Sequence, residues 1–313
     1  MNASLIINDK KLYSGIAMVA ILLCHFNTVS VAWHECLKYL TPGFIGVDFF
    51  IFFSGWSLCY SWEKNSVTCF FKRRLTRIMP LYIVFAVIVT VLFITLRGDF
   101  FSFFDWICNL TTLNYWGIGG AYIDWYLPAI LVFYILFPIV FYIVKKTELA
   151  GACLVLFLSG LLLLFTDFHW RYNAAIARIP IFSLGVLFFI DKSEKKTQGI
   201  SGSLIFLVVA IFLIVFKSGF DGIFLTNCIA ACIILFISLV LPLTKRHGIK
   251  SIEFIGAHSL EIYVSHIISC WIIELIQVSQ LTVLFLYLVL NFGISCIMIL
   301  FNKYLSKYII KLV

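Results

Sequence analysis

Long, unbroken runs of apolar residues dominate the sequence. Of its 313 residues, 63% are hydrophobic and only 12% are charged, whereas about a quarter of residues are charged in soluble domains. A soluble domain of this length has too little interior to bury so many apolar side chains. The runs are also too continuous for a transmembrane β-barrel, whose strands alternate over about ten residues. These features exclude a soluble enzyme, a disordered chain and a nucleic-acid-binding module, and they predict an all-α integral membrane protein.

Ten segments approach the roughly 20 apolar residues that a membrane-spanning helix needs. The first of them lacks a small-residue cleavage site, which favours a retained helix over a signal peptide. Because neither an internal repeat nor a soluble domain is evident, residues 1–313 are predicted to form a single polytopic membrane domain. The spans are expected near residues 12–33, 43–62, 78–97, 124–144, 149–166, 173–190, 202–217, 222–243, 258–277 and 281–302.

Basic residues are distributed unequally between alternate loops. Of the 23 Lys and Arg residues, 18 fall in one set of loops and 4 in the other, while Arg178 lies inside a predicted span. The positive-inside rule places the basic loops in the cytoplasm. We therefore expect a multi-pass protein of the cell membrane, with both termini cytoplasmic. The net charge of +8 then reflects topology and contact with the bilayer, and requires no nucleic-acid partner.

Two further features concern the loops and the cysteines. The longest stretch between spans, 98–123, combines aromatic residues with glycines, which is typical of an amphipathic or re-entrant segment at the outer interface. Most of the ten cysteines lie inside spans and lack metal-ligand or disulfide spacing. They are predicted to be packing residues, so neither a metal site nor a bound cofactor is expected.

Ionisable side chains inside the spans are the strongest functional signal. Each costs about 2.5–3.5 kcal/mol at the bilayer centre on insertion scales. The structural alternative for each is an interhelical hydrogen bond or a snorkelling end residue, but six such groups in ten helices favour a function. They are His25, Asp48, Arg178, Glu261, His266 and Glu274.

His25 and Asp48 form the predicted catalytic pair. His25 lies roughly 20 Å from the cytoplasmic end of the first span, and Asp48 lies near the outer end of the second. Consecutive spans with a short connection usually pack side by side. A carboxylate beside an imidazole orients the ring and stabilises its protonated form, as a general base requires. His266, roughly 12 Å into the membrane, is expected to line the same cavity.

Basic side chains indicate ligands on both sides of the membrane. Arg178, near the outer end of its span, could bind an anionic or polyhydroxyl substrate, or it could be a snorkelling anchor. Arg73, Arg74 and Arg77 form the densest cytoplasmic cluster. This cluster either contacts lipid headgroups or binds a phosphorylated ligand, since the guanidinium fork matches phosphate geometry.

Five segments also match the motifs of a known family in order. They are Gly15-Ile16-Ala17 leading to His25-Phe26, Gly43 to Trp56, the Arg-Arg-x-x-Arg-Ile-x-Pro-x-Tyr run from Arg73 to Tyr82, Asp124 to Pro138, and Ser259 to His266 preceded by Arg178 to Gly185. Together they resemble the membrane-bound acyltransferase family three, whose members O-acylate carbohydrates and related surface molecules.

The resemblance implies an O-acyltransferase that uses acetyl-CoA or another acyl-CoA as its donor. The acceptor would be a hydroxyl of an extracytoplasmic carbohydrate, such as a surface polysaccharide. His25, oriented by Asp48, would be catalytic. Donor binding would fall to Lys11, Arg73, Arg74, Arg77 and His266, and acceptor binding to Trp125, Tyr126 and Arg178.

One position departs from the family pattern. The family's first motif has an Arg eleven positions before the His, and this chain has Ser14 there. Eleven residues turn about 1100°, close to three full turns, so the two positions share a helix face. Lys11 lies about one helical turn before Ser14 and about 40° from the face of His25. It is the expected substitute for the missing Arg.

Two other functions remain open at this stage. Ten helices with buried His, Asp and Glu could form a proton-coupled transporter or a polysaccharide exporter, although the sequence shows no repeat. A catalytically inactive relative that only binds a partner is the third possibility. Transfer of label from acetyl-CoA to a glycan distinguishes the enzyme from both.

Overall fold

A computed structural model describes residues 10–29, 43–165, 169–194, 198–215, 228–234, 249–276 and 280–309. Within these ranges the chain forms helices joined by turns and loops, and none of it forms a β-strand, which confirms the all-α prediction. The chain divides into two compact units. Unit 1 comprises Met1–Ala17, Phe44–Phe70 and Ala129–Gly256, and unit 2 comprises Met18–Gly43, Phe71–Pro128 and Ala257–Val313.

Unit 1 is organised around one buried helix, α10 (Ile179–Glu194). It packs against α4, α8 and α11, and its residues from Ile181 to Ile190 are buried. A helix that is apolar all round fits such a central place. The unit also contains residues of α2 (Lys10–Val29), α4 (Ile45–Lys64), α5 (Val67–Leu92), α7 (Tyr126–Thr147), α8 (Leu149–Phe165), α9 (Trp170–Ile176), α11 (Gln198–Val215) and α13 (Lys250–Ala257).

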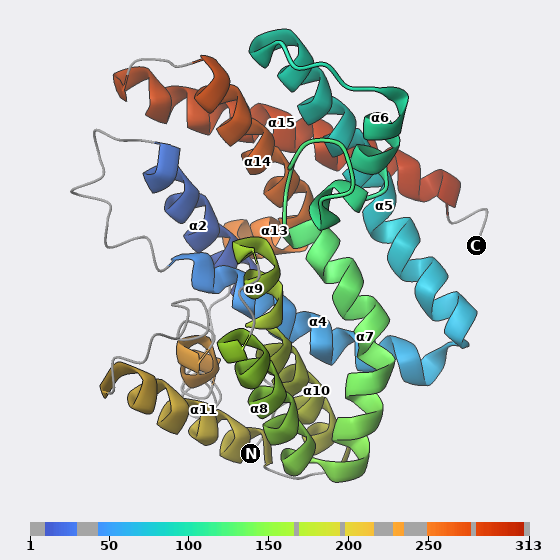
Figure 1. The fold of residues 1–313 in the computed structure, drawn as a ribbon, viewed down its shortest axis with the longest axis vertical. Helices are drawn as coiled ribbons and strands as arrows, with labels where there is room; N and C mark the ends of the chain where they lie inside the picture. The colour runs from blue at the N-terminus through green and yellow to red at the C-terminus, as the bar shows by residue number, and fades with distance from the viewer. Residues whose placement is uncertain are drawn as a thin grey trace. The chain divides into compact units, whose positions relative to one another are not determined.

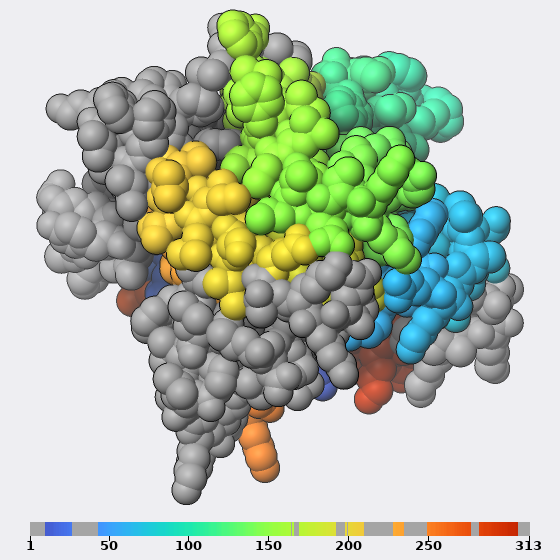
Figure 2. Space-filling model, turned by 90° about the horizontal axis from the view of Figure 1, so that it is seen from below, coloured from blue at the N-terminus to red at the C-terminus, as the bar shows by residue number. Residues whose placement is uncertain are grey.

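The outer sides of α8 and α11 are apolar as well. The two helices are in contact and share one face of unit 1 (Figure 2). Phe157 and Leu158 of α8 and Val208 of α11 are more than half exposed there. Helices that are apolar on both their inner and outer sides are typical of proteins surrounded by lipid.

Two glycines allow α4 and α10 to approach each other closely. A Cβ at Gly55 would lie 2.2 Å from the carbonyl oxygen of Phe182, and one at Gly185 would lie 2.2 Å from that of Phe52. Small residues at helix crossings let backbones pack directly against each other in membrane proteins. This crossing holds the core of unit 1 together.

Unit 2 contains the remainder of α2 together with α14 (Ser259–Ile276), which packs against α15 (Gln280–Ile309) (Figure 1). The hydroxyl of Tyr287 in α15 donates to the carbonyl of Leu22 in α2, 2.9 Å away. The unit also contains most of α5 (Val67–Leu92), the π-helix η3 (Phe93–Arg97), α6 (Phe103–Leu110), the 3₁₀-helix η4 (Leu113–Trp116) and the first residues of α7.

The segment 98–123 folds back along α5. Tyr82 of α5 lies roughly 20 Å along the helix from Arg97, yet its hydroxyl donates to the carbonyl of Asn109 at 2.9 Å. Buried amides satisfy the irregular backbone, because Asn109 accepts from the N–H of Ala121 and Asn114 donates to its carbonyl. Buried irregular backbone requires such internal partners. The segment therefore packs back against α5, and its amphipathic or re-entrant placement at the outer interface stays a prediction.

Five helices in the described ranges are long and apolar enough to cross a membrane. They coincide with the predicted spans near 78–97, 124–144, 173–190, 258–277 and 281–302. Most of the predicted span 222–243 lies outside the described residues, so the count of ten spans, like the single domain, stays a prediction. The five helices are Val67–Arg97, Tyr126–Thr147, Trp170–Asp191, Ser259–Ile276 and Thr282–Leu305.

Replacing Gly185 with Ala should destabilise the protein. The added methyl group would force α4 and α10 apart, and overpacking of this kind costs about 1–3 kcal/mol. The matched control is Gly293→Ala, since a Cβ there meets nothing within 4 Å and Ala is the better helix former. Thermal unfolding in detergent should show a lower midpoint for Gly185→Ala alone. Equal midpoints for the two variants would contradict the close crossing.

Candidate functional site

His25 in α2 faces His266 in α14, and both belong to unit 2. Their ring centroids lie 4.8 Å apart, and the ring planes meet at 67° in an edge-to-face arrangement. His266 is fully buried and His25 is half-buried. The structure therefore brings together two of the predicted site residues, one expected to be catalytic and the other expected to line the same cavity.

The backbone determines which nitrogen of His25 can act as a base. Its Nδ1 lies 3.0 Å from the carbonyl oxygen of Ile21. A carbonyl oxygen can only accept a hydrogen bond, so Nδ1 carries the proton in the neutral ring and Nε2 keeps its lone pair. Nε2 is therefore the atom of His25 that can remove a proton from a substrate.

His266 has a different environment. Its ring is close to backbone groups of Ile262 and Tyr263, but neither ring nitrogen makes a hydrogen bond of normal geometry to a described residue. The edge-to-face contact places this ring directly beside that of His25.

A line of contacts leads from His266 to the start of α7. The Tyr263 ring lies 4.9 Å from the His266 ring, and its hydroxyl donates to Oδ1 of Asp124 at 2.8 Å. Oδ2 of Asp124 accepts the N–H of Leu127, also at 2.8 Å. The carboxylate thus fixes both the first turn of α7 and the ring that packs on His266. Asp124 begins the segment Asp124 to Pro138 that matches the family, but no role was predicted for it.

The predicted acceptor residues Trp125 and Tyr126 lie beside this line of contacts. The ring of Tyr126 packs on that of Tyr263 at 4.8 Å, and the ring of Trp125 lies 6.0 Å from that of Tyr126. Tyr126 is almost fully buried and Trp125 is half-buried. The two rings thus extend the ring contacts of His266 and Tyr263, and their role in acceptor binding stays a prediction.

Asp48 and Arg178 form a buried ion pair in unit 1. The Nε of Arg178 lies 2.9 Å from Oδ1 of Asp48, and the two side chains are 2% and 0% exposed. Nη1 of Arg178 also donates to the carbonyl of Ala174 at 3.0 Å. Each charge is thereby compensated in a place where a lone charge is expensive. The pairing of Asp48 with His25, which is in unit 2, stays a prediction, as does acceptor binding by Arg178.

The predicted donor residues lie on the N-terminal parts of α5 and α2. Arg73 and Arg77 are exposed on one side of α5, four residues apart, and Arg74 is half-buried. In α2, Lys11 is exposed. The neighbouring Lys10 was not among the predicted donor residues. Its ammonium group donates to Oγ of Ser57 and lies 6.0 Å from the centroid of the Phe53 ring.

The remaining intramembrane carboxylates differ in burial. Glu261 is buried and accepts a hydrogen bond from the amide of Asn302, which supports the structural alternative for this residue. Glu274 is exposed. Among the described residues, no group of three or more His, Cys, Asp or Glu side chains could hold a metal ion.

Removing one partner of the buried ion pair should be costly. Asp48→Asn would leave the guanidinium of Arg178 buried without its countercharge, which costs about 3–5 kcal/mol in comparable pairs. The control is Asp99→Asn, because the pair between Arg97 and Asp99 is partly exposed and such pairs contribute about 0–1 kcal/mol. Thermal unfolding in detergent should separate the variants. An unchanged midpoint for Asp48→Asn would contradict the role of the pair.

The sequence was also compared with known proteins. The model of a family described as an acyltransferase domain, acyltransferase family 3, matches residues 15–300. No curated protein and no solved structure matches the chain. The matched region includes the histidine pair, the ion pair and the basic cluster of α5, and it covers most of the sequence. The chain therefore belongs to acyltransferase family 3.

Proposed function

We propose that the chain transfers an acyl group, acetyl in the simplest case, from a cytosolic acyl-CoA to a hydroxyl of an extracytoplasmic carbohydrate such as a surface polysaccharide. The family match supports acyl transfer in general and favours it over transport. The observation that carries the proposal is the contact between His25 and His266, because it places a potential base beside a second imidazole in an apolar unit.

The proposed chemical step uses Nε2 of His25. This atom takes the proton of the acceptor hydroxyl while the hydroxyl oxygen attacks the thioester carbonyl. A C–O bond forms, the C–S bond breaks, and the proton passes to the departing CoA sulfur. General base catalysis of this kind contributes about 10²–10⁴-fold. His266 can accept a hydrogen bond from the protonated ring, a role predicted for Asp48 from the sequence.

The two substrates would approach from opposite sides. We place the phosphates of the donor at the cytoplasmic face, near Arg73, Arg74, Arg77 and the N-terminal part of α2 with Lys11. This follows the proposed orientation with both termini in the cytoplasm, since CoA is too highly charged to enter lipid. The acceptor would arrive from outside near Trp125 and Tyr126, with Arg178 as a further proposed contact.

The experiment that tests this proposal is acyl transfer in membranes with His25→Ala. Transfer of label from acetyl-CoA to the surface glycan should fall by about 10²–10⁴-fold, and His266→Ala should also reduce it. His169→Ala is the control, because His169 is exposed and lies outside the site. Wild-type transfer by the His25→Ala variant would overturn the assignment of the base.

A further inference from the structure

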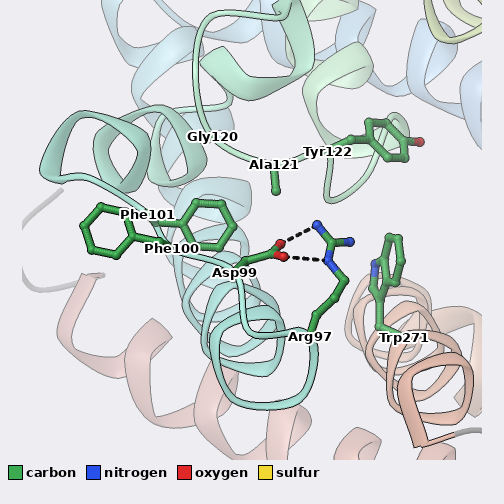
Figure 3. A pocket seen from close by; sticks show the side chains of 8 residues that line it. All are labelled: Arg97, Asp99, Phe100, Phe101, Gly120, Ala121, Tyr122 and Trp271. Carbon is green, nitrogen blue, oxygen red and sulfur yellow. Dashed lines mark hydrogen bonds and ion pairs between the residues drawn. The ribbon is translucent and has the colours of Figure 1, made fainter.

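A pocket of about 450 Å³ lies in unit 2 where the long helix α5–η3 ends (Figure 3). This volume lies within the range of about 300–1,000 Å³ that is common for small-molecule sites. The lining residues come from three parts of the unit: the helix end, the segment 98–123 and α14. They are Arg97, Asp99, Phe100, Phe101, Gly120, Ala121, Tyr122 and Trp271.

An ion pair is fixed in the wall of this pocket. Nε of Arg97 donates to Oδ1 of Asp99 at 3.0 Å, and Nη2 donates to Oδ2, so the pair is bidentate. The chain reverses between the two residues at Gly98, whose φ of 75° favours glycine. The reversal follows the π-helix η3, and π-helical turns are frequent at functional sites. The local backbone thus holds the two polar groups side by side.

Aromatic side chains surround the pair. Nε1 of Trp271 donates to the carbonyl of Ile123 at 3.2 Å, and its ring packs edge-on against Phe93 at 4.8 Å. Phe101 lies on the opposite side of the pair from Trp271, and the methyl group of Ala121 points into the space between them (Figure 3). The guanidinium of Arg97 is further held over the Phe93 ring at 4.3 Å.

The chemistry of these walls selects the class of ligand. Asp99 uses two of the five N–H donors of Arg97, and its carboxylate keeps further lone pairs, so the wall offers both donors and acceptors. The pair has no net charge, which disfavours anions and cations alike. Aromatic rings offer large apolar faces beside these polar groups. A neutral ligand with hydroxyl groups and an apolar ring face, such as a pyranose, matches all of these features.

We propose that this pocket binds an uncharged sugar unit of the acceptor glycan, with its ring against the aromatic walls and its hydroxyls on Arg97 and Asp99. The inference rests on the proposed function. Its location supports it, because Trp271 lies five residues beyond His266 in α14, about 7.5 Å along the axis. Ile123 and Asp124 continue from the pocket to Tyr263, so a neighbouring sugar unit can reach the histidine pair.

Filling the pocket tests the proposal directly. In Ala121→Phe the added ring would occupy the space of the sugar, and the KM for the acceptor should rise by at least about tenfold while the KM for acetyl-CoA stays unchanged. The matched control is Ile118→Phe, an exposed position on the same segment that does not line the pocket. Equal acceptor KM values for Ala121→Phe and the wild type would overturn the proposal.

A binding measurement separates this proposal from the proposed function. Saturation-transfer NMR on the full chain in detergent, with a panel of methyl hexopyranosides as probes, requires no catalysis. The expected result is a sugar signal for the wild type and Ile118→Phe that is lost in Ala121→Phe. This result would support the pocket even if no acyl transfer is found. A signal that persists in Ala121→Phe, or no signal for any sugar with the wild type, would overturn the pocket.

The ion pair also predicts that the pocket prefers neutral sugars to charged ones. The wild type should bind methyl glucoside better than methyl glucuronide, because Asp99 neutralises Arg97. In Asp99→Asn the exposed positive charge should shift this preference toward the glucuronide by about tenfold, as expected when a polar partner in a pocket is changed. Asp99→Glu should keep the wild-type preference. The same ratio of affinities in Asp99→Asn and the wild type would overturn the role of the pair.

Discussion

Inside an apolar helical chain, every charged side chain needs a partner, and the core of unit 1 depends on one such pair. Arg178 and Asp48 are almost completely buried, and each compensates the charge of the other. The pair belongs to the region where α4 and α10 cross, and there Gly55 and Gly185 allow direct contact between the two backbones. Close packing and charge compensation therefore support each other, since a wider crossing would separate the two charges and leave each of them buried alone.

In unit 2, a hydrogen bond and ring contacts hold the histidine pair on which the proposed function rests. The carbonyl of Ile21 accepts a hydrogen bond from Nδ1–H of His25, so Nε2 keeps its lone pair. His266 is fully buried beside it, and Tyr263 connects it with Asp124. The contacts that shape the site thus run from α2 through α14 to the start of α7. Each of these residues is held by a backbone group or by an aromatic neighbour, so the rings are positioned before any substrate binds.

The segment between α5 and α7 shows how polar side chains replace regular backbone hydrogen bonds. Asn109 and Asn114 satisfy the N–H and the carbonyl of Ala121, and Asp105 accepts the N–H of Gly120 at 2.8 Å. The hydrogen bond from the N–H of Gly120, together with those from the hydroxyl and the N–H of Ser102, lowers the pKa of Asp105, so its carboxylate stays ionised as an acceptor. This tethered loop forms one wall of the pocket and, three residues later, carries Asp124. The segment therefore runs from the pocket to Asp124, which Tyr263 connects with the histidine pair.

The sequence alone determined that the chain is helical and apolar, where five of its spanning helices lie, and that His25 and His266 are residues of interest. These features follow from composition, from hydropathy over about 20 residues and from the cost of ionisable groups in lipid, all of which are local properties. Only the tertiary structure decided the partners. Asp48 pairs with Arg178, 130 positions away in the sequence, and His25 lies against His266, in a helix far along the chain. Hydropathy cannot specify such pairs, because the rotation of each helix and the depth of each crossing depend on packing between segments that are distant in sequence.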